Sequence, residues 1–360
     1  MIKSYDNKVI LGLMSGTSLD GLDIIACRFK HETKAYNFEI LAAETIEYAK
    51  EWKHKLSQVF HYSELEVKEL DIRYAEFISD CIINFNEKYH LSPDFIGSHG
   101  HTVFHKPNQA YTLQIGNGKI IKKLTNISTV SNFRKQDMML GGQGAPLVPI
   151  GDKLLFSEFD FCLNLGGFAN LSWSDDGIRK ACDISPCNIL LNMLANRLGI
   201  EYDHGGELAS KGTIIDELCD HWNTYPFYKQ ESPKSLGREW FENNFLKDLN
   251  NPNDSIQDLL RTGVEHIATQ ISHWINEKSN QISQKILVTG GGTFNNFLLD
   301  QIRLRLKENI LLSRPDPQII NYKEALIFAF LAFLRVKGSN NVLASVTGAS
   351  QDHSSGDVFW

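Results

Sequence analysis

Three glycine-containing turns have the composition of a nucleotide-binding site. The first is MSGTSLDG at residues 14–21, the second is Asn164–Gly167, and the third is Thr289–Gly292. Glycine lets the backbone approach a ligand closely, and successive N–H groups beside Ser and Thr hydroxyls can hold an anion. The first turn matches neither the P-loop nor GxGxxG, so alone it fits a plain hairpin loop equally well. Three such turns, each after a predicted strand, together indicate a nucleotide cleft.

Two carboxylates are placed where they could do chemistry. Asp20, in the first turn, could hold a hydrated Mg²⁺, because hard cations prefer carboxylate oxygen and water. Asp183 ends a predicted strand just before Ser185 and Pro186, which suit the N-cap and first turn of a helix. A phosphate could lie at that helix N-terminus, and Asp183 could act as a general base. An isolated Asp more often only caps a helix, but its place in a second glycine-flanked group of strands favours the base.

The histidines and cysteines do not form a metal-binding pattern. His99, His101 and His105 lack the HExxH signature and have no accompanying Cys or Glu cluster, so packing or a polar substrate contact is favoured over zinc. Cys182 and Cys187 lie beside the candidate base, but no neighbouring His would activate either thiol. We expect both to be small buried residues. The six cysteines contain no CxxC pair, which favours reduced thiols.

The elements that would position these residues form two similar groups. Apolar or alternating runs predict three strands in the first group and three in the second, at 8–14, 22–30, 38–48, 159–165, 168–173 and 178–183. Helical spacing follows each triplet, and the patterns beyond predict strands at 94–97, 111–115, 127–132 and 285–289 and helices at 257–277 and 295–307. The apolar run 325–336 is predicted to be a buried helix. A repeated βββα unit predicts an α/β protein with two similar lobes that face each other across a cleft.

Length and composition set the class of protein. The chain has 360 residues, of which 42% are hydrophobic and 22% charged, an ordinary globular composition that excludes disordered and fibrous proteins. This length exceeds the usual single core, so two lobes are expected. Between Arg134 and Pro149, the sequence GGQGAP predicts a flexible connection. The expected domains are 1–134, to which 336–360 could return, and 135–335.

Charge and hydrophobic patterning exclude other classes. A net charge of −7 without a run of Lys and Arg argues against a nucleic-acid partner. No segment approaches the ~20 apolar residues of a membrane span, so no membrane partner is expected. The N-terminus does not resemble a signal peptide, which predicts a cytoplasmic location.

Eight blocks of sequence carry a specific resemblance. They are VILGLMSGTSLDGLDI (9–24), GSHGHTVFH (97–105), LQIGNG (113–118), FRKQDMMLGGQGAPLVP (133–149), LNLGGFANL (163–171), KSLGREWF (234–241), VTGGGTFNNFL (288–298) and KEALIFAFLA (323–332). In this order they resemble the anhydro-N-acetylmuramic acid kinases, and the match extends to Ala349. MSGTSLDGLD and GGQGAPLVP are highly specific to that family, whereas the triple glycine is not.

The resemblance implies a fold and a reaction. The fold would be the two-lobed actin-like ATPase (ribonuclease H-like) fold, with duplicated βββα units around a nucleotide cleft. The reaction would convert 1,6-anhydro-N-acetylmuramic acid, ATP and water to N-acetylmuramic acid 6-phosphate and ADP during peptidoglycan recycling. Members use Mg²⁺ and are commonly dimeric, so a homodimer is expected.

The resemblance also assigns residues by position. Asp183 matches the catalytic aspartate, which would deprotonate a water that attacks the anomeric carbon, after which the freed O6 attacks the γ-phosphoryl group. Arg134 and Glu324 fall where sugar contacts are expected, and His99 is a further substrate candidate. Nucleotide contacts are expected from the three turns, at Gly16, Thr17, Ser18, Leu19, Asp20, Gly21, Leu22, Asp23, Gly166, Gly167, Gly290, Gly291 and Gly292.

The chain departs from the family pattern at three places. It has DISPCN at residues 183–188 where the family has DTGPGN, DHGG at 203–206 where the family has Lys-Asp-Gly, and His101 in place of a frequent Gln. Two missing glycines should alter the approach of the backbone to the phosphates. Another sugar kinase of the same fold, or a catalytically weakened ATP-binding regulator, therefore stays an alternative. Retention of Asp183 favours the kinase.

Overall fold

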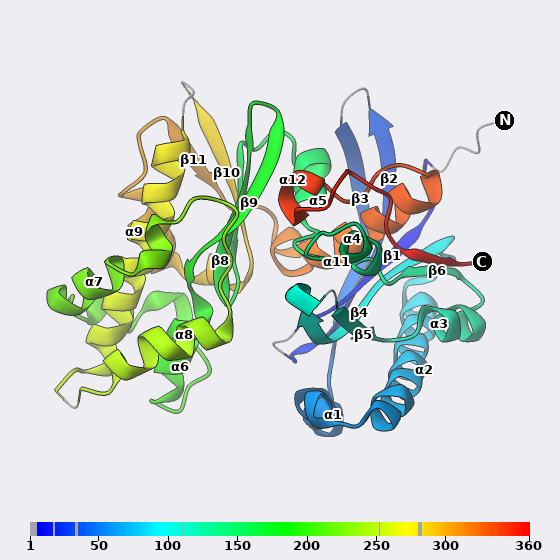
Figure 1. The fold of residues 1–360 in the computed structure, drawn as a ribbon, viewed down its shortest axis with the longest axis horizontal. Coiled ribbons are helices and arrows are strands. Elements are labelled where there is room, and N and C mark those ends of the chain that lie inside the picture. The colour runs from blue at the N-terminus through cyan, green and yellow to red at the C-terminus, as the bar shows by residue number, and fades with distance from the viewer. Residues whose placement is uncertain (1–5, 17–18, 33–34, 110, 252, 280–282) are drawn as a thin grey trace. The chain divides into compact units, whose positions relative to one another are not determined.

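The chain folds into two compact units, coloured by residue number in Figure 1. The computed structural model describes residues 6–16, 19–32, 35–109, 111–251, 253–279 and 283–360. Unit 1 comprises the chain up to Ser157 together with Tyr322–Trp360, and unit 2 is Glu158–Asn321. The lobe boundary expected at residue 134 stays a prediction, because a unit defined by packing need not be the unit that moves.

Unit 1 is built on one sheet. In the described residues it has seven strands in the order β12-β6-β4-β1-β2-β3, with β5 paired to β4. β1, β2 and β3 form an antiparallel meander, whereas β4 runs parallel to β1 and β6. The strands are β1 (Ile10–Ser15), β2 (Gly21–Glu32), β3 (Ala35–Glu47), β4 (Phe95–Lys106), β5 (Tyr111–Ile115), β6 (Ser128–Ser131) and β12 (Asp357–Phe359).

Helices cover both faces of the unit 1 sheet. The long helix α2 (Glu64–Tyr89) begins with a capping box between Ser63 and Glu66, and its apolar side joins β1, β2 and β4 in one core. The opposite face carries α11 (Pro317–Lys337), which contains the apolar run expected to be a buried helix. The other helices are α1 (Lys50–Gln58), α3 (Gly118–Thr125), α4 (Lys135–Met139), α5 (Pro149–Leu155) and α12 (Ala344–Thr347).

Two glycines let α11 lie directly on the sheet. Gly12 and Gly97 are register partners on β1 and β4. A Cβ added to Gly12 would be 1.9 Å from the Ala325 carbonyl oxygen, and one added to Gly97 would be 2.3 Å from that of Phe328. Any larger residue would push the helix away from the strands, and with it Glu324.

Unit 2 repeats the arrangement with a sheet in the order β11-β10-β7-β8-β9. Its strands are β7 (Phe161–Leu165), β8 (Phe168–Asp175), β9 (Ile178–Pro186), β10 (Gln284–Thr289) and β11 (Ile310–Ser313). One continuous core joins these strands to the helices on one side of the sheet (Figure 1). The helices are α6 (Asn188–Asn196), α7 (Asp216–Asn223), α8 (Arg238–Phe245), α9 (Ile256–Lys278) and α10 (Asn296–Arg303).

The duplication expected from the sequence is confirmed in the strand order. In each unit, three antiparallel strands are followed by two further strands parallel to the first, giving β3-β2-β1-β4-β6 in unit 1 and β9-β8-β7-β10-β11 in unit 2. This third-second-first-fourth-fifth order is that of the expected ribonuclease H-like fold. The α/β class and the repeated βββα units are therefore correct, while a cleft between the units stays a prediction.

The expected start of α6 is wrong. Ser185 and Pro186 were expected at the N-cap and first turn, but β9 continues through both because they pair with Ala169 and Phe168 of β8. The helix begins only at Asn188. Sheet pairing therefore overrides a local helix-start pattern.

The GGQG segment is held within unit 1. Asp137, which is fully buried, accepts a hydrogen bond from the Gly144 N–H through Oδ2 at 2.6 Å and one from the Thr347 hydroxyl through Oδ1 at 2.6 Å. The Gln143 N–H donates to the Thr347 carbonyl at 2.9 Å. These bonds join the glycine segment to α12. Among the described helices, none combines the length and apolarity needed to span a membrane.

Candidate active site

Asp183 lies on β9 beside an irregularity in strand pairing. Its register partner is Asn170, whereas Ala169 pairs with Ser185, so Ile184 is an extra residue on β9. The Asp183 carboxylate accepts a hydrogen bond from the Leu236 N–H at 2.7 Å. Burial raises the pKa of Asp183 to about 6, and that hydrogen bond opposes the rise. The carboxyl group is therefore largely ionised at neutral pH but binds a proton more readily than an exposed Asp.

Asp183 ends a row of polar residues across four strands. Thr289 on β10 pairs with Asn164 on β7, Asn164 pairs with Asn170 on β8, and Asn170 pairs with Asp183. Direct register partners project from the same face of a sheet, so these four side chains share one face. Sequence reasoning missed Asn164 and Asn170, although both belong to the LNLGGFANL block. The motif contains both asparagines, but only the pairing register of the strands shows that they lie in one row with Asp183.

The glycine turn between β7 and β8 caps α6. The carbonyl of Gly167 accepts from the N–H groups of Cys187 and Ile189 at 2.9 and 3.1 Å, and that of Gly166 accepts from the Asn188 N–H at 3.1 Å. These are the donors that a helix N-terminus would offer to an anion. A phosphate bound by them, as expected from the sequence, is therefore not supported.

The triple glycine packs closely against the end of β7. Gly290 has φ +84°, and a Cβ there would be 2.5 Å from the Asn164 side-chain oxygen. A Cβ on Gly292 would be 2.7 Å from the Leu165 Cβ, whereas one on Gly291 would have no neighbour nearer than 3.7 Å. Packing alone thus explains Gly290 and Gly292. Gly291 is the one of the three with room for a ligand.

The changed residues of the DISPCN segment lie inside unit 2. Ile184 and Cys187 belong to its hydrophobic core, and Ser185 is fully buried. Burial raises the pKa of the Cys187 thiol to about 12, so the inert buried role expected of this cysteine is supported. These three changes alter core packing and leave Asp183 in place.

In unit 1, the first glycine turn joins β1 to β2. Thr17 and Ser18 lie outside the described residues. The Leu19 N–H donates to the Gly16 carbonyl at 3.4 Å, and Leu19 has φ +60°. Asp20 is exposed. A Cβ on Gly21 would be 2.5 Å from the Ile46 carbonyl oxygen, so close packing against β3 requires glycine there.

Asp23 lies just inside β2, next to the turn, whereas Leu22 is buried in the core. The Thr45 hydroxyl donates to the Asp23 carboxylate at 2.6 Å. Burial raises the pKa of Asp23 to about 6, with the Thr45 bond opposing the rise and the charges of Glu324 and Asp20 adding to it. Asp23 is thus electrostatically coupled to a residue expected to bind the sugar.

The three substrate candidates are brought together in unit 1. The Arg134 guanidinium donates to His99 Nε2 through Nε at 3.1 Å and through Nη2 at 2.9 Å, and to the Gly144 carbonyl through Nη1 at 2.8 Å. Burial and the Arg134 charge hold the pKa of His99 well below its usual value, so His99 is neutral. Its Nδ1–H then donates to the Gly100 carbonyl at 2.9 Å.

Glu324 completes this group. Although it is solvent-exposed, the protein around its carboxyl group raises its pKa, and the charges of Lys323 and Arg134 oppose the rise. Its neighbour Lys323 is paired with the buried Asp152 at 2.7 Å. Of the two cations that lower the pKa of Glu324, Lys323 is thus neutralised by Asp152, and Arg134 is outside that pair. A guanidinium held by a neutral imidazole can bind hydroxyl or carboxylate oxygens of a sugar.

His99 and His101 lie on opposite faces of β4. Leu13 pairs with Ser98 and Ser15 pairs with His101, so β4 has one extra residue at this bulge, where Gly100 has φ +72°. His99 contacts the Phe328 ring of α11 at a centroid distance of 4.5 Å. His101 instead forms a hydrogen bond with Ser15 on the other face. Of these two histidines, His99 is therefore the one that remains a candidate for a substrate contact.

No metal cluster accompanies the histidines. In the part of the chain that the structure describes, no group of three or more His, Cys, Asp or Glu side chains could hold an ion. A magnesium ion bound mainly to phosphate needs only one or two protein carboxylates, and the exposed Asp20 fits that requirement.

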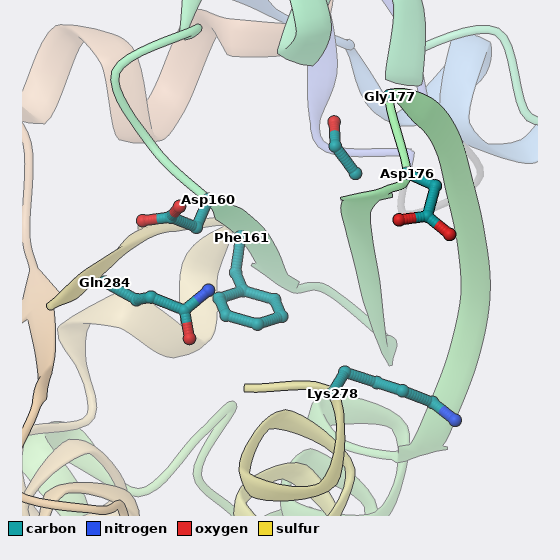
Figure 2. A pocket seen from close by; sticks show the side chains of 7 residues that line it. Asp160, Phe161, Asp176, Gly177, Lys278 and Gln284 are labelled. Atoms are coloured by element: carbon teal, nitrogen blue, oxygen red, sulfur yellow. The ribbon is translucent and has the colours of Figure 1, made fainter. Parts of the chain in front are cut away.

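A cavity in unit 2 contains none of the predicted site residues. It has a volume of about 300 Å³, and the residues lining it include Asp160, Asp176, Lys278 and Gln284 (Figure 2). Lys278 ends α9, and the other three lie where β7 and β10 begin and where β8 turns into β9, at the opposite end of the sheet from Asp183. Each unit thus carries its own group of candidate residues: Asp183 with its polar row in unit 2, and the Arg134 group with the first turn in unit 1.

Comparisons with known proteins identify the family. The family model described as anhydro-N-acetylmuramic acid kinase matches residues 8–360. The anhydro-N-acetylmuramic acid kinase of Synechococcus elongatus is 35% identical, with 97% of this chain and 99% of the relative covered. That of Haemophilus influenzae is 32% identical, with 97% of each covered. Among solved structures, Acidaminococcus fermentans (R)-2-hydroxyglutaryl-CoA dehydratase component A has a TM-score of 0.46 at 14% identity, with 91% of this chain and 98% of that chain covered. By the family model and these relatives, the chain belongs to the anhydro-N-acetylmuramic acid kinase family.

Proposed function

We propose that this protein is an ATP-dependent kinase that converts 1,6-anhydro-N-acetylmuramic acid and water to N-acetylmuramic acid 6-phosphate, with ADP as the second product. The observation that carries the proposal is the family match over residues 8–360 together with a partly buried Asp183 whose pKa is raised to about 6. A general base needs a pKa near the operating pH, and Asp183 meets that condition. Because the changed residues of the DISPCN segment, Ile184, Ser185 and Cys187, are buried and Asp183 is retained, the weakened-regulator alternative is not favoured.

Asp183 would supply the base. Its carboxylate takes a proton from water, and the water oxygen adds to C1 of the sugar. The C1–O6 bond of the anhydro bridge breaks, and O6 attacks the γ-phosphoryl group of ATP, whose bond to the bridging oxygen of ADP breaks so that ADP leaves. The water oxygen thus becomes the C1 hydroxyl, and the bridge oxygen becomes the phosphate ester oxygen. The Leu236 N–H, at 2.7 Å, orients the base.

The other predicted residues would bind and orient the substrates. Arg134, held by His99, donates to sugar oxygens, and Glu324 accepts from a sugar hydroxyl. The turn from Gly16 to Asp23 and the glycines at 166–167 and 290–292 hold ATP. Asp20 would hold Mg²⁺, which when bound would neutralise charge on the phosphates. Positioning and charge neutralisation supply most of the catalysis in phosphoryl transfer.

Product analysis in ¹⁸O-labelled water tests the proposal. The protein is incubated with Mg-ATP and 1,6-anhydro-N-acetylmuramic acid. The mass of the sugar phosphate and of its fragments is then measured by mass spectrometry before the anomeric hydroxyl exchanges with solvent. We expect one label at the C1 hydroxyl and none in the phosphoryl group. A label in the phosphoryl group, or a product without any label, would show that hydrolysis and phosphorylation are not coupled as proposed.

The setting of the enzyme also stays a proposal. We infer a cytoplasmic homodimer that acts on this small sugar in peptidoglycan recycling, because the family resemblance supports it. Light scattering of the purified protein tests the dimer, since a monomeric mass at working concentration would contradict it.

A further inference from the structure

A chain of buried hydrogen bonds lies behind the first glycine turn. The hydroxyls of Tyr74 and Tyr48 are 2.6 Å apart, the Tyr48 hydroxyl donates to Ser15 Oγ at 2.7 Å, and Ser15 Oγ is 2.9 Å from His101 Nδ1. All four residues are buried, with Ser15 2% and His101 3% exposed. They come from α2, from the end of β3, from β1 and from β4. None of them is among the residues assigned to catalysis or ligand binding above.

The bonds of this chain run in one direction. Because the Tyr48 proton is donated to Ser15, the Tyr74 hydroxyl donates to Tyr48. Burial lowers the pKa of His101 to about 4, so the imidazole is neutral and its Nδ1 accepts the Ser15 proton. Every hydroxyl in the order Tyr74, Tyr48, Ser15, His101 thus has a partner, and removal of any one leaves a buried neighbour unsatisfied.

Tyr48 contacts both ends of the turn. Its side chain binds Ser15, the last residue of β1 and the neighbour of Gly16. Its backbone N–H donates to the carbonyl of Asp20, which directly precedes β2, at 3.3 Å. One residue therefore fixes the point where the chain leaves the first strand and the point where it enters the second.

We propose that Tyr48, supported by Ser15, His101 and Tyr74, is the positioning residue of the nucleotide-phosphate turn and sets the affinity for ATP. The inference rests on the proposed function only in taking this turn as the phosphate-binding segment. Holding the ends of the turn before the ligand arrives lowers the ordering cost of binding. His101, which replaces a glutamine frequent in the family, serves as the acceptor at the end of the chain.

Three variants and one control test the proposal. Tyr48→Phe removes the side-chain bond to Ser15 and keeps the ring packing against Tyr74 and the backbone bond to Asp20. His101→Leu removes the acceptor, whereas His101→Gln restores one. Tyr225→Phe is the matched control, because Tyr225 is also buried and hydrogen-bonded through its hydroxyl to Asp248 at 2.6 Å, but belongs to unit 2.

The readouts are the KM values for ATP and sugar, kcat, and the affinity for ADP by calorimetry. One lost hydrogen bond corresponds to about 3- to 10-fold in an equilibrium constant. We expect Tyr48→Phe and His101→Leu to raise KM for ATP and weaken ADP binding by about that factor, with KM for sugar unchanged. His101→Gln should stay near wild type. Tyr225→Phe should lower the melting temperature without moving either KM.

The outcomes separate this inference from the proposed function. Unchanged ADP affinity in Tyr48→Phe, or an equal rise of both KM values, would reduce the chain of bonds to core packing and overturn the inference. Failure of the wild-type protein to phosphorylate the anhydro sugar would instead refute the proposed function. In that case ADP calorimetry on the same variants still decides the role of Tyr48.

Discussion

At the scale of single residues, the hydrogen bonds around Asp183 exclude the role of a cap for α6. A capping carboxylate would accept from the first N–H groups of α6, but the carbonyls of Gly166 and Gly167 occupy them. Asp183 accepts from Leu236 instead. Sequence reasoning could single out Asp183 from its motif. It could not find Leu236, because the two residues are 53 positions apart and meet only through the tertiary fold.

Replacing Asp183 by Asn should remove the base and keep the shape. We expect turnover to fall by about 10²- to 10⁴-fold, which is the usual contribution of a positioned general base. The Asn side-chain oxygen can still accept from Leu236, so the far-ultraviolet spectrum and the ADP affinity should match those of the wild type. Steady-state kinetics measures the loss. Near-wild-type turnover would remove Asp183 from the mechanism.

The pH dependence of turnover should follow the ionisation of Asp183. The base acts as the carboxylate, so kcat/KM should rise with pH and reach half its plateau near the pKa of about 6. Burial also raises the pKa of Asp23 to about 6, so the profile is compared with that of Asp23→Asn. A rise that persists in this variant belongs to Asp183, whereas its disappearance assigns the ionisation to Asp23.

The same ionisation should appear in stability. The pKa of Asp183 rises from the ordinary value of 3.8 to about 6 in the folded protein. Folding therefore favours the protonated form of this carboxyl group. Its contribution to the free energy of unfolding is present below the lower pKa and is lost as the pH rises through the higher one. Asn cannot ionise, so Asp183→Asn should gain stability relative to wild type over that interval. Urea unfolding measures the difference, and a pH-independent value would contradict the shift.

At the scale of elements, α11 depends on two residues without side chains. Gly12 and Gly97 lie next to each other under the backbone of Ala325 and Phe328. Glu324 and the Phe328 ring that contacts His99 are carried by this helix. The distance between helix and sheet therefore sets the position of a sugar-binding candidate.

Gly12→Ala should move that helix. The added Cβ would overlap the Ala325 carbonyl, and overpacking of a core typically costs about 1–3 kcal/mol. The KM for sugar should rise as well, because Glu324 shifts with the helix. Gly237→Ala is the control, since a Cβ there meets nothing within 4 Å and φ is −126°. Denaturant unfolding and kinetics of both variants decide, and equal stability of the two would argue against the close approach.

Most strands could be predicted from the sequence, because alternation reports which face of a strand is buried. The expected strand at 111–115 has the observed limits, and the expected helix at 257–277 differs by one residue at each end. The start of α6 and the bulge in β4 could not be predicted. Both depend on which residue of a neighbouring strand is the partner, and a single sequence does not specify that pairing.

At the scale of the whole molecule, the two units differ in chain continuity. Unit 2 is one segment whose core contains no residue from unit 1, whereas the unit 1 sheet is covered by α11 near the other end of the chain. The duplicated strand order could be expected from the repeated triplet of strands. The return of residues 322–360 to unit 1 was expected only from residue 336, because the buried α11 gave no sign of which sheet it covers.

The continuity of the chain within each unit predicts which fragment folds alone. Residues 158–321 should unfold cooperatively as an isolated fragment, because their hydrophobic core is complete. Residues 1–157 should not, because one face of their sheet lacks α11 and would expose a large apolar surface. Circular dichroism during urea unfolding tests both fragments. A broad transition for 158–321, or a cooperative one for 1–157, would contradict this division.

The bulge in β4 makes the length of that strand less critical within the bulge than elsewhere. An odd number of inserted residues normally exchanges the faces of everything that follows in a strand, but a bulge absorbs one extra residue. Ser98 and His101 therefore both lie opposite residues of one face of β1, Leu13 and Ser15, and deletion of Gly100 would leave a regular strand with His101 still opposite Ser15. This deletion should disturb the nucleotide turn less than His101→Leu does, since it keeps the acceptor that the replacement removes.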